Sequence, residues 1–355
     1  MQTLALLFGG RSPEHEVSVR SARNIYKAID RSRFDVLLVG IDPQGRWLAV
    51  AEAHLYAEAT VATGRPLMMV PGAGRMALRD AATGEVLPVD VVFPITHGPL
   101  GEDGSLQGLL RQLDLPFVGP DVLASAACMD KDCTKRLLRD AGLLVAPFRT
   151  FAAHARASID FFAVANELGL PLFVKPACMG SSVGVRKATD KASFDAALAE
   201  AFRYDHKVVV ESFIEGRELE CAVMGNEVVA SSGIGEVVMG GGFYDYDAKY
   251  ESADAAQVLI PAPGLDDELL AKLSLVARHA YQVLGCEGLS RVDMFLTAEG
   301  HVYVNEVNTL PGFTDISMYP QLWGQAGTGY SELIGLLVDL ALARGVRDAR
   351  LERSR

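Results

Sequence analysis

Short apolar runs alternate with amphipathic segments along most of the chain. The apolar runs have the length of strands and end in turn residues, and segments with a helical repeat follow them. At the start of the chain this pattern predicts strands at 4–8, 35–41 and 89–94 and helices at 18–29 and from 105. Such alternation is typical of an open, mostly parallel sheet that binds ligands at the carboxyl ends of its strands. Residues 43–88, rich in Ala, Gly and turn residues, are predicted to be a peripheral excursion.

A break at Gly119-Pro120 begins the rest of the chain. There the pattern predicts strands at 148–151, 172–175, 207–211, 218–224 and 227–232, and helices at 131–141, 158–168, 191–202, 266–284 and from 330. The Gly- and Tyr-rich stretch at 233–254 is too polar for a core and too aromatic for a simple linker. It is typical of a mobile lid, and an aromatic surface loop or a protein contact is the alternative.

Two short strands near the end of the chain carry polar side chains at alternate positions. Arg291 and Asp293 share one face of the first strand, and Glu306 and Asn308 share one face of the second. A turn centred on residues 299–300 pairs Asp293 with Glu306 and Arg291 with Asn308. Facing carboxylates are destabilising unless a cation neutralises them, and carboxylate and amide oxygens suit Mg²⁺. A hairpin with a polar, solvated face fits the same spacing, so both interpretations stay open.

Composition narrows the class of ligand and the compartment. The net charge of −12 argues against a broad nucleic-acid footprint and against anionic membranes. No apolar run approaches the length of a membrane span, and the first residues lack the basic region of a signal peptide. The 5 cysteines form no CxxC pair, which fits free thiols in a reducing cytosol. We therefore expect a cytoplasmic protein that binds small molecules.

Three segments carry groups suited to a nucleotide. Lys175 ends a predicted strand and precedes Gly180-Ser181-Ser182, whose free backbone N–H groups can wrap phosphate oxygens; a flexible loop with a surface lysine is the alternative. Lys131 adds to this site only if it converges with Lys175. The bend that follows the strand at 207–211 can hydrogen-bond the edge of adenine, which alone is a weak signal.

Two further segments carry groups suited to an amino acid. The turn at Gly9-Gly10 leads to Glu14 at the start of a helix, where a carboxylate can hold an ammonium group or simply cap the helix. Residues 308–320 follow the polar hairpin directly. Their backbone N–H groups therefore suit an oxyanion hole or a carboxylate clamp.

Together these segments describe an ATP·Mg²⁺ site of the ATP-grasp kind, and their order closely resembles that of the D-alanine–D-alanine ligase family. The resemblance covers nearly the whole chain. It is carried by LFGGRSPEHEVS at 7–18, HGPLGEDGSLQG at 97–108, MDK at 129–131, KPACMGSSVG at 175–184, FYDYDAKY at 243–250 and NEVNTLPGFT at 305–314. Each motif alone is weak, but the ordered set is highly specific.

The resemblance implies an α/β fold of three units. These are a Rossmann-like substrate domain with an open parallel sheet at 1–120, a central ATP-grasp subdomain at 121–207 and a C-terminal ATP-grasp subdomain with the metal site at 208–355. The two subdomains sandwich the nucleotide. The resemblance also implies ATP and D-alanine as substrates, two Mg²⁺ ions that Mn²⁺ can replace, a role in peptidoglycan precursor synthesis, and a homodimer.

Individual residues take roles from the same resemblance. The implied nucleotide-binding residues are Lys131, Lys175, Ser181, Ser182, Glu211, Ile214, Glu218, Lys249 and Phe295. The implied metal ligands are Asp293, Glu306 and Asn308. The implied substrate-binding residues are Glu14, His97, Arg291, Gly312, Ser317 and Met318. The implied catalytic residues are Glu14, Ser181, Tyr250, Arg291 and Gly312, with Ser181 and Tyr250 linked to Glu14 in a hydrogen-bond relay. Arg291 is expected to meet the substrate carboxylate rather than to balance Asp293.

Two other functions stay open. One is an ATP-grasp ligase whose second substrate is another amino acid or D-lactate, although Tyr250 favours an amine nucleophile by the same resemblance. The other is a nucleotide-binding sensor with a decayed site, which predicts lost metal ligands, yet all of those residues are present. Ser212 stands where some relatives carry lysine, so no charge is expected over the adenine from that position.

Overall fold

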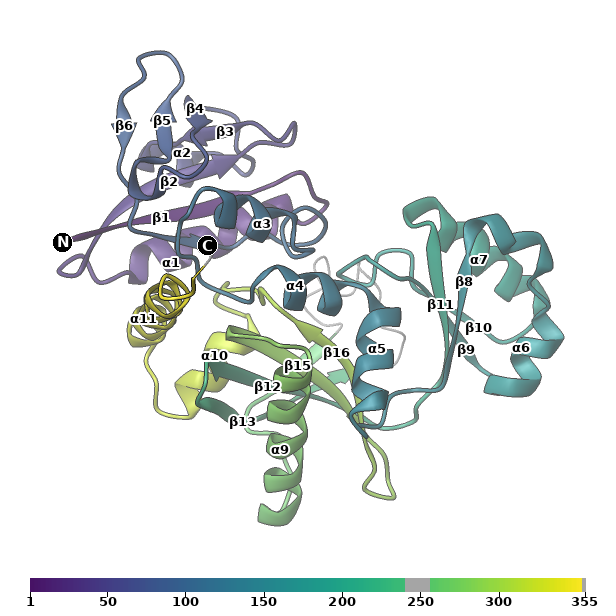
Figure 1. Cartoon of the computed structure of the whole chain (residues 1–355). Helices are drawn as coiled ribbons and strands as arrows, with labels where there is room; N and C mark the ends of the chain where they lie inside the picture. Colours follow the sequence, from purple (N-terminus) through teal and green to yellow (C-terminus); the bar gives the residue numbers. More distant parts are fainter. Residues whose placement is uncertain (240–255, 353–355) are drawn as a thin grey trace.

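The chain folds around three β-sheets with helices packed against them, so the predicted α/β class is confirmed (Figure 1). The computed structural model describes residues 1–239 and 256–352. Lys249, Tyr250 and most of the predicted lid fall at 240–255, outside the described residues. Residues 233–239 of that stretch instead continue a strand, β13.

The first sheet has seven strands in the order β6-β5-β4-β3-β2-β1-β7. Its strands are β1 (Gln2–Gly9), β2 (Phe34–Ile41), β3 (Trp47–Ala49), β4 (Arg65–Met69), β5 (Leu78–Asp80), β6 (Val86–Leu87) and β7 (Val91–Pro94), and its helices are α1 (His15–Ala28), α2 (Glu52–Ala57) and α3 (Ser105–Gln112). Only β1, β2 and β7 run parallel, because β3 to β6 pair antiparallel. The sheet is therefore mixed and not mostly parallel as predicted. The region 43–88 lies at one edge of it, as a peripheral excursion would, and adds short strands that the sequence pattern did not predict.

The carboxyl ends of β1 and β7 place two predicted substrate residues side by side. Gly9 has φ +86, and a Cβ there would lie 2.3 Å from the carbonyl oxygen of Ile41, so only glycine fits this turn. Ser18 of α1 accepts a hydrogen bond from Gly9 N (2.8 Å) and donates one to the Ile95 carbonyl (2.5 Å). These bonds fix the start of α1, where Glu14 lies, beside the segment that follows β7, where His97 lies.

The second sheet has four strands in the order β10-β9-β11-β8. Its elements are β8 (Phe148–Ala152), α6 (Phe161–Leu168), β9 (Leu172–Pro176), β10 (Arg186–Ala188), α7 (Lys191–Tyr204) and β11 (Lys207–Ser212). We expected β11 to open the C-terminal unit, and this is wrong, because β11 pairs with both β8 and β9. Val208 and Val210 of β11 pack with Val174 of β9 in one core, so the change of sheet falls after Ser212.

The third sheet has five strands in the order β14-β13-β12-β15-β16. Its strands are β12 (Arg217–Gly225), β13 (Val229–Met239), β14 (Ala256–Leu259), β15 (Gly288–Leu296) and β16 (Val302–Asn308), and the helices packed on it include α4 (Val122–Met129), α5 (Lys131–Asp140) and α9 (Asp267–Val283). Ala124 and Cys128 of α4 and Leu138 of α5 lie in the core of this sheet. Helices α4 and α5, which the sequence analysis assigned to the central unit, therefore pack in the core of the third sheet.

The polar hairpin has the predicted register. Asp293 of β15 pairs with Glu306 of β16, and Arg291 pairs with Asn308. The register then shifts between Asp293 and Met294, which pairs with Val304. The structure thus has a β-bulge that the sequence did not predict, with Asn305 as the extra residue.

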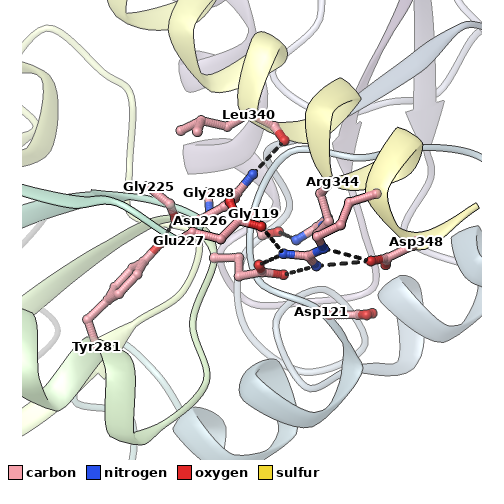
Figure 2. Close-up of polar contacts among 12 residues, drawn as sticks. Gly119, Asp121, Gly225, Asn226, Glu227, Tyr281, Gly288, Leu340, Arg344 and Asp348 are labelled. Atoms are coloured by element: carbon pink, nitrogen blue, oxygen red, sulfur yellow. Dashed lines mark hydrogen bonds and ion pairs between the residues drawn. The ribbon is translucent and has the colours of Figure 1, made fainter. Parts of the chain in front are cut away.

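Two C-terminal helices, α10 (Met318–Gln325) and α11 (Tyr330–Asp348), join the first unit to the third. Figure 2 shows the polar contacts at this joint. Buried Arg344 of α11 donates to the Gly119 carbonyl (2.6 Å), and Asn226 donates to the Leu340 carbonyl (2.9 Å). Arg344 also donates to the Phe117 carbonyl (2.7 Å). The joint therefore links the end of the first unit, through α11, to the turn between β12 and β13.

In the described part of the chain, no single helix has the length and apolar character to cross a membrane. The pair α10 and α11 passes that test together, although the two are bent by 104°. All five cysteines are free.

Candidate functional site

A cavity of about 650 Å³ lies between the second and third sheets. Its walls come from β9, β10 and β11 on one side and from β12, β13, β15 and β16 on the other. The predicted nucleotide and metal residues that line it are Lys131, Lys175, Ser181, Ser182, Glu211, Ile214, Glu218, Asp293, Phe295 and Glu306. The fold therefore brings together every predicted nucleotide residue that the structure describes, although their individual roles stay predictions.

Two lysines and one carboxylate form a buried cluster in this cavity wall. Glu211 accepts from Lys175 Nζ at 2.8 Å and lies 3.3 Å from Lys135 Nζ. Burial lowers the pKa of Lys135, whereas for Lys175 the attraction of Glu211 outweighs burial and raises the pKa. Burial opposes ionisation of Glu211, but Lys135 and Lys175 outweigh it and lower the pKa of that carboxyl. Lys175 thus keeps its charge inside the cavity, as phosphate binding requires.

Lys131 converges with this cluster, as the sequence required for it to matter. Its ammonium group donates to the Met179 carbonyl (2.7 Å) and lies 3.7 Å from Glu306. Lys131 therefore joins the Gly/Ser loop to the polar hairpin. In that loop Ser181 and Ser182 have φ values of 49° and 58°, a left-handed conformation that is uncommon for serine.

A positive charge lies near the bend that is predicted to bind adenine, where the sequence analysis expected none from Ser212. Lys187 of β10 lines the cavity, and its Nζ lies 5.3 Å from the centre of the Phe213 ring. A lysine on the neighbouring strand thus provides a cation close to Ser212. Sequence reasoning missed it because the pairing of β10 with β9 is not visible in the pattern.

The predicted metal ligands lie on one face of the polar hairpin. Asp293 is buried, and its Oδ2 accepts from Asn308 Nδ2 at 2.9 Å. Asp293, Glu306 and Asn308 supply carboxylate and amide oxygens, which are hard donors, so these residue types fit Mg²⁺. Among the described residues, no group of three or more His, Cys, Asp or Glu side chains could hold a metal ion. The predicted set is of another kind, because it combines two carboxylates with the amide of Asn308.

Arg291 corrects one prediction about this face. Its guanidinium donates to Asp293 through Nε (2.7 Å) and Nη2 (2.7 Å), and Nε also lies 2.9 Å from Glu220. Burial opposes its charge, but Asp293 and Glu220 outweigh burial and raise the pKa of Arg291. The expectation that Arg291 does not balance Asp293 is wrong. The planar guanidinium of Arg291 can bind both oxygens of a carboxylate, and Asp293 lies two residues further along the same strand.

A second cavity, of about 230 Å³, lies between the first and third units. All of the predicted substrate residues line it, namely Glu14, His97, Arg291, Gly312, Ser317 and Met318. Ser317 is the N-cap residue of α10, and a helix N-terminus favours a carboxylate. Gly180, Ser181, Val237 and Glu306 line both cavities, so the two adjoin.

Glu14 lies where the two cavities meet. Its Oε1 accepts a hydrogen bond from Ser181 Oγ, which is the described half of the predicted relay. A Cβ on Gly98 or on Gly180 would lie 3.1 Å from Glu14 Oε2, so both loops approach the carboxylate closely. Glu14 therefore has a place beside the substrate cavity, and the Tyr250 half of the relay lies outside the described residues.

Two carboxylates of this site have no role in the sequence predictions. Glu220 of β12 pairs with Asp293 of β15. The sequence carried a signal for Glu220, because it lies two residues after Glu218 and so shares its face of the strand. Glu102 lines the substrate cavity and accepts from Gly98 N at 2.5 Å and from Leu310 N at 3.3 Å. Burial and the nearby Glu14 raise the pKa of Glu102 to about 8.

The raised pKa of Glu102 predicts a pH effect on stability. Between its ordinary value of 4.5 and about 8 the folded state holds a proton that the unfolded state has lost. Unfolding free energy should therefore fall as pH rises through this window, by at most about 1.4 kcal/mol per pH unit. Urea unfolding at pH 5 to 8 should show this extra slope in the parent protein and not in Glu102→Gln. Equal slopes in both proteins would refute the assignment.

Family models match both halves of the chain. The D-ala D-ala ligase N-terminus model covers residues 3–120, and the D-ala D-ala ligase C-terminus model covers residues 137–339. The D-alanine–D-alanine ligase A of Escherichia coli strain K12 is 54% identical over 358 residues, covering 98% of each chain. The D-alanine–D-alanine ligase of Shouchella clausii is 51% identical and covers 99% of this chain and 97% of its own.

Solved structures agree with these relatives. The D-alanine–D-alanine ligase from Coxiella burnetii has a TM-score of 0.85 at 34% identity, with 99% of this chain and 98% of that chain covered. The VanG D-Ala:D-Ser ligase from Enterococcus faecalis has a TM-score of 0.86 at 34% identity, with 96% and 99% covered. The resemblance seen in the motifs is confirmed. The chain belongs to the D-alanine–D-alanine ligase family.

Proposed function

We propose that this chain joins two D-alanines into D-alanyl-D-alanine at the cost of ATP, through a D-alanyl phosphate, for peptidoglycan precursor synthesis. The adjoining cavities carry the proposal. One cavity, between two sheets, is lined by lysine side chains. The other is lined by a carboxylate, an arginine and a helix N-terminus. Ser181 and Glu306 line both cavities. A phosphoryl donor and an amino acid bound there would meet at the shared wall.

The nucleotide cavity supplies positive charge for the phosphates of ATP. Lys131 and Lys175 lie in its wall beside the Gly/Ser loop, and positioning with charge neutralisation is the main catalytic need of phosphoryl transfer. Lys249 is proposed to reach the γ-phosphate. Asp293, Glu306 and Asn308 would hold two Mg²⁺, or Mn²⁺ in their place. Bound metal would neutralise charge on the transferring phosphoryl group.

Activation of the first D-alanine uses the substrate cavity. Glu14 binds its ammonium group, with His97 nearby, and Arg291 and the Gly312 N–H hold its carboxylate. A carboxylate oxygen attacks the γ-phosphorus, the bond to the β-phosphate oxygen breaks, and ADP leaves. The carboxylate, a poor electrophile, becomes an acyl phosphate. Because this intermediate hydrolyses readily, water must be excluded from the joined cavities.

Ligation follows at the same carbonyl carbon. The second D-alanine, with its carboxylate at Ser317 and Met318, attacks through its amine after losing a proton. Arg291 and the Gly312 N–H stabilise the oxyanion, where one donor contributes roughly 3–4 kcal/mol in well-studied enzymes. The C–O bond to phosphate breaks, and the dipeptide and inorganic phosphate leave.

The larger assembly is part of the same proposal. We place the enzyme in the cytoplasm as a homodimer. Its substrate domain is 1–120, and the boundary between its two ATP-grasp subdomains lies later than the predicted 207/208. The pairing of β11 in the second sheet favours a later end, after Ser212, for the middle subdomain.

Substrate choice is tested by phosphate release. The purified protein is incubated with ATP, Mg²⁺ and one of D-alanine, D-serine or D-lactate, and then with D-alanine paired with each of the others. D-alanine alone should release phosphate and give the dipeptide. The VanG relative named above is a D-Ala:D-Ser ligase, so release only with D-serine present would favour that alternative. No release with any substrate would favour the sensor.

A further inference from the structure

The loop that carries Gly312 is anchored by the first unit two residues before that glycine, at Leu310. The Leu310 N–H donates to Glu102 Oε1 at 3.3 Å, and the Leu310 carbonyl lies 3.0 Å from His97 Nδ1. A carbonyl oxygen can only accept, so Nδ1 of His97 carries the proton in this contact. Both polar groups of one backbone residue are thus bound by side chains that come from the other side of the substrate cavity.

The same loop is anchored again immediately after Gly312. The Phe313 N–H donates to Ser21 Oγ at 3.2 Å, and the Phe313 carbonyl accepts from Asn24 Nδ2 at 3.3 Å and from the Tyr330 hydroxyl at 2.6 Å. Ser21 and Asn24 lie on α1, the helix that begins beside Glu14. Gly312 therefore lies between two fixed points, and its N–H direction depends on both.

Glu102 links this loop to the loop that contacts Glu14. Its second oxygen, Oε2, accepts from Gly98 N at 2.5 Å, and Gly98 lies against Glu14. The turn that carries Glu102 is itself held, because Gln107 donates to the Gly101 carbonyl at 2.9 Å. One carboxyl group therefore spans two backbone amides, one beside the proposed ammonium site and one beside the proposed oxyanion donor.

We propose that Glu102 is a positioning residue for ligation: it clamps the Gly98 and Leu310 amides together and so sets the Gly312 N–H against the reacting carbonyl. The proposal rests on the proposed function of this site. Glu102 acts through the backbone rather than on the reacting atoms. Misplacement of a catalytic group by about 1 Å can cost on the order of 10²-fold in rate, so loss of the clamp should be measurable.

The clamp predicts a kinetic pattern that a merely structural role would not give. An oxyanion donor acts mainly in the transition state, so its misplacement lowers kcat more than it raises KM. Glu102→Ala should lower kcat by about 10- to 100-fold and change KM for ATP and for D-alanine by much less. Glu102→Gln keeps one good acceptor for two N–H donors, and it should lie between Glu102→Ala and the parent.

The control is Asp103→Asn in the same turn. Asp103 accepts from Leu100 N (2.8 Å) and Ser105 N (2.9 Å) and thus stabilises the turn without contacting Leu310. It changes a carboxyl group at the neighbouring position of the same turn. Its kcat should stay within about twofold of the parent, since surface changes rarely cost more than about 0.5 kcal/mol.

Hydrogen exchange tests the clamp without any turnover. Glu102→Ala in the full chain should speed exchange of the Leu310 and Gly98 amides, whereas Asp103→Asn should leave both at the parent rate. Unchanged exchange at Leu310 in Glu102→Ala, or equal kcat losses in both variants, would overturn the proposal. A parent protein that releases no phosphate with D-alanine would instead overturn the proposed function, and the exchange rates would still decide the clamp.

Discussion

Glu306→Gln should abolish turnover, with kcat falling by at least about 10³-fold. Glu306 faces Asp293 across the hairpin, lines both cavities and lies 3.7 Å from Lys131. The substitution keeps the shape of the side chain but removes the negative charge that a hard cation needs. Metal ions supply several kcal/mol of transition-state stabilisation, and about 4 kcal/mol corresponds to 10³-fold. Steady-state phosphate release at saturating ATP, Mg²⁺ and D-alanine measures this fall in kcat.

The matched control is Glu299→Gln in the turn of the same hairpin. Glu299 lies outside both cavities, so its change of charge should leave kcat within about twofold of the parent. Binding of Mn²⁺, followed by calorimetry, should weaken in Glu306→Gln and not in Glu299→Gln. Retained activity with unchanged Mn²⁺ affinity would remove Glu306 from the metal site.

Glu211→Gln should destabilise the fold by about 3–5 kcal/mol, because it leaves the buried ammonium group of Lys135 and the partly buried one of Lys175 without their carboxylate. Glu211 is 3% exposed and Lys135 is 1% exposed, so water cannot take the place of the lost partner. Lys175, the other partner, lies 2.8 Å from Glu211. Urea unfolding followed by circular dichroism measures the change in unfolding free energy.

Glu215→Gln provides the comparison for this effect. Glu215 is exposed in the bend that follows the same strand, and its substitution should change stability by less than about 0.5 kcal/mol. Lys135→Met combined with Glu211→Gln should cost less than the sum of the single changes, because the two residues form one interaction. A loss below about 1 kcal/mol for Glu211→Gln would mean that the cluster is hydrated.

The register of the polar hairpin could be predicted from the sequence because it depends only on residues that are close together in the chain. A period of two and a single turn position fix which residues face each other, and the observed pairs Asp293–Glu306 and Arg291–Asn308 follow from them. The bulge at Asn305 could not be predicted, since it depends on how β16 meets the rest of the sheet. The ion pair of Arg291 with Asp293 was missed because the pattern gives the shared face but not the side-chain direction.

Long-range pairing explains the other errors. Strand β11 has the pattern of any buried strand, and only its pairing with β8 and β9 assigns it to the second sheet. Strands β3 to β6 are too short to show alternation. Lys135 lies four residues after Lys131 on α5 and so shares its face, but its burial against Glu211 needs the fold. Glu102 stood in a recognised motif, and only its distance to Leu310 gives it a role.

Isotope transfer from D-alanine to phosphate tests the proposed chemistry most directly. D-alanine labelled with ¹⁸O in its carboxylate is incubated with the enzyme, ATP and Mg²⁺, and the products are analysed by mass spectrometry. If the carboxylate attacks the γ-phosphorus in these joined cavities, one ¹⁸O atom should appear in each inorganic phosphate released, together with D-alanyl-D-alanine. Phosphate without the label would show that water attacks ATP instead and would contradict an acyl phosphate at this site.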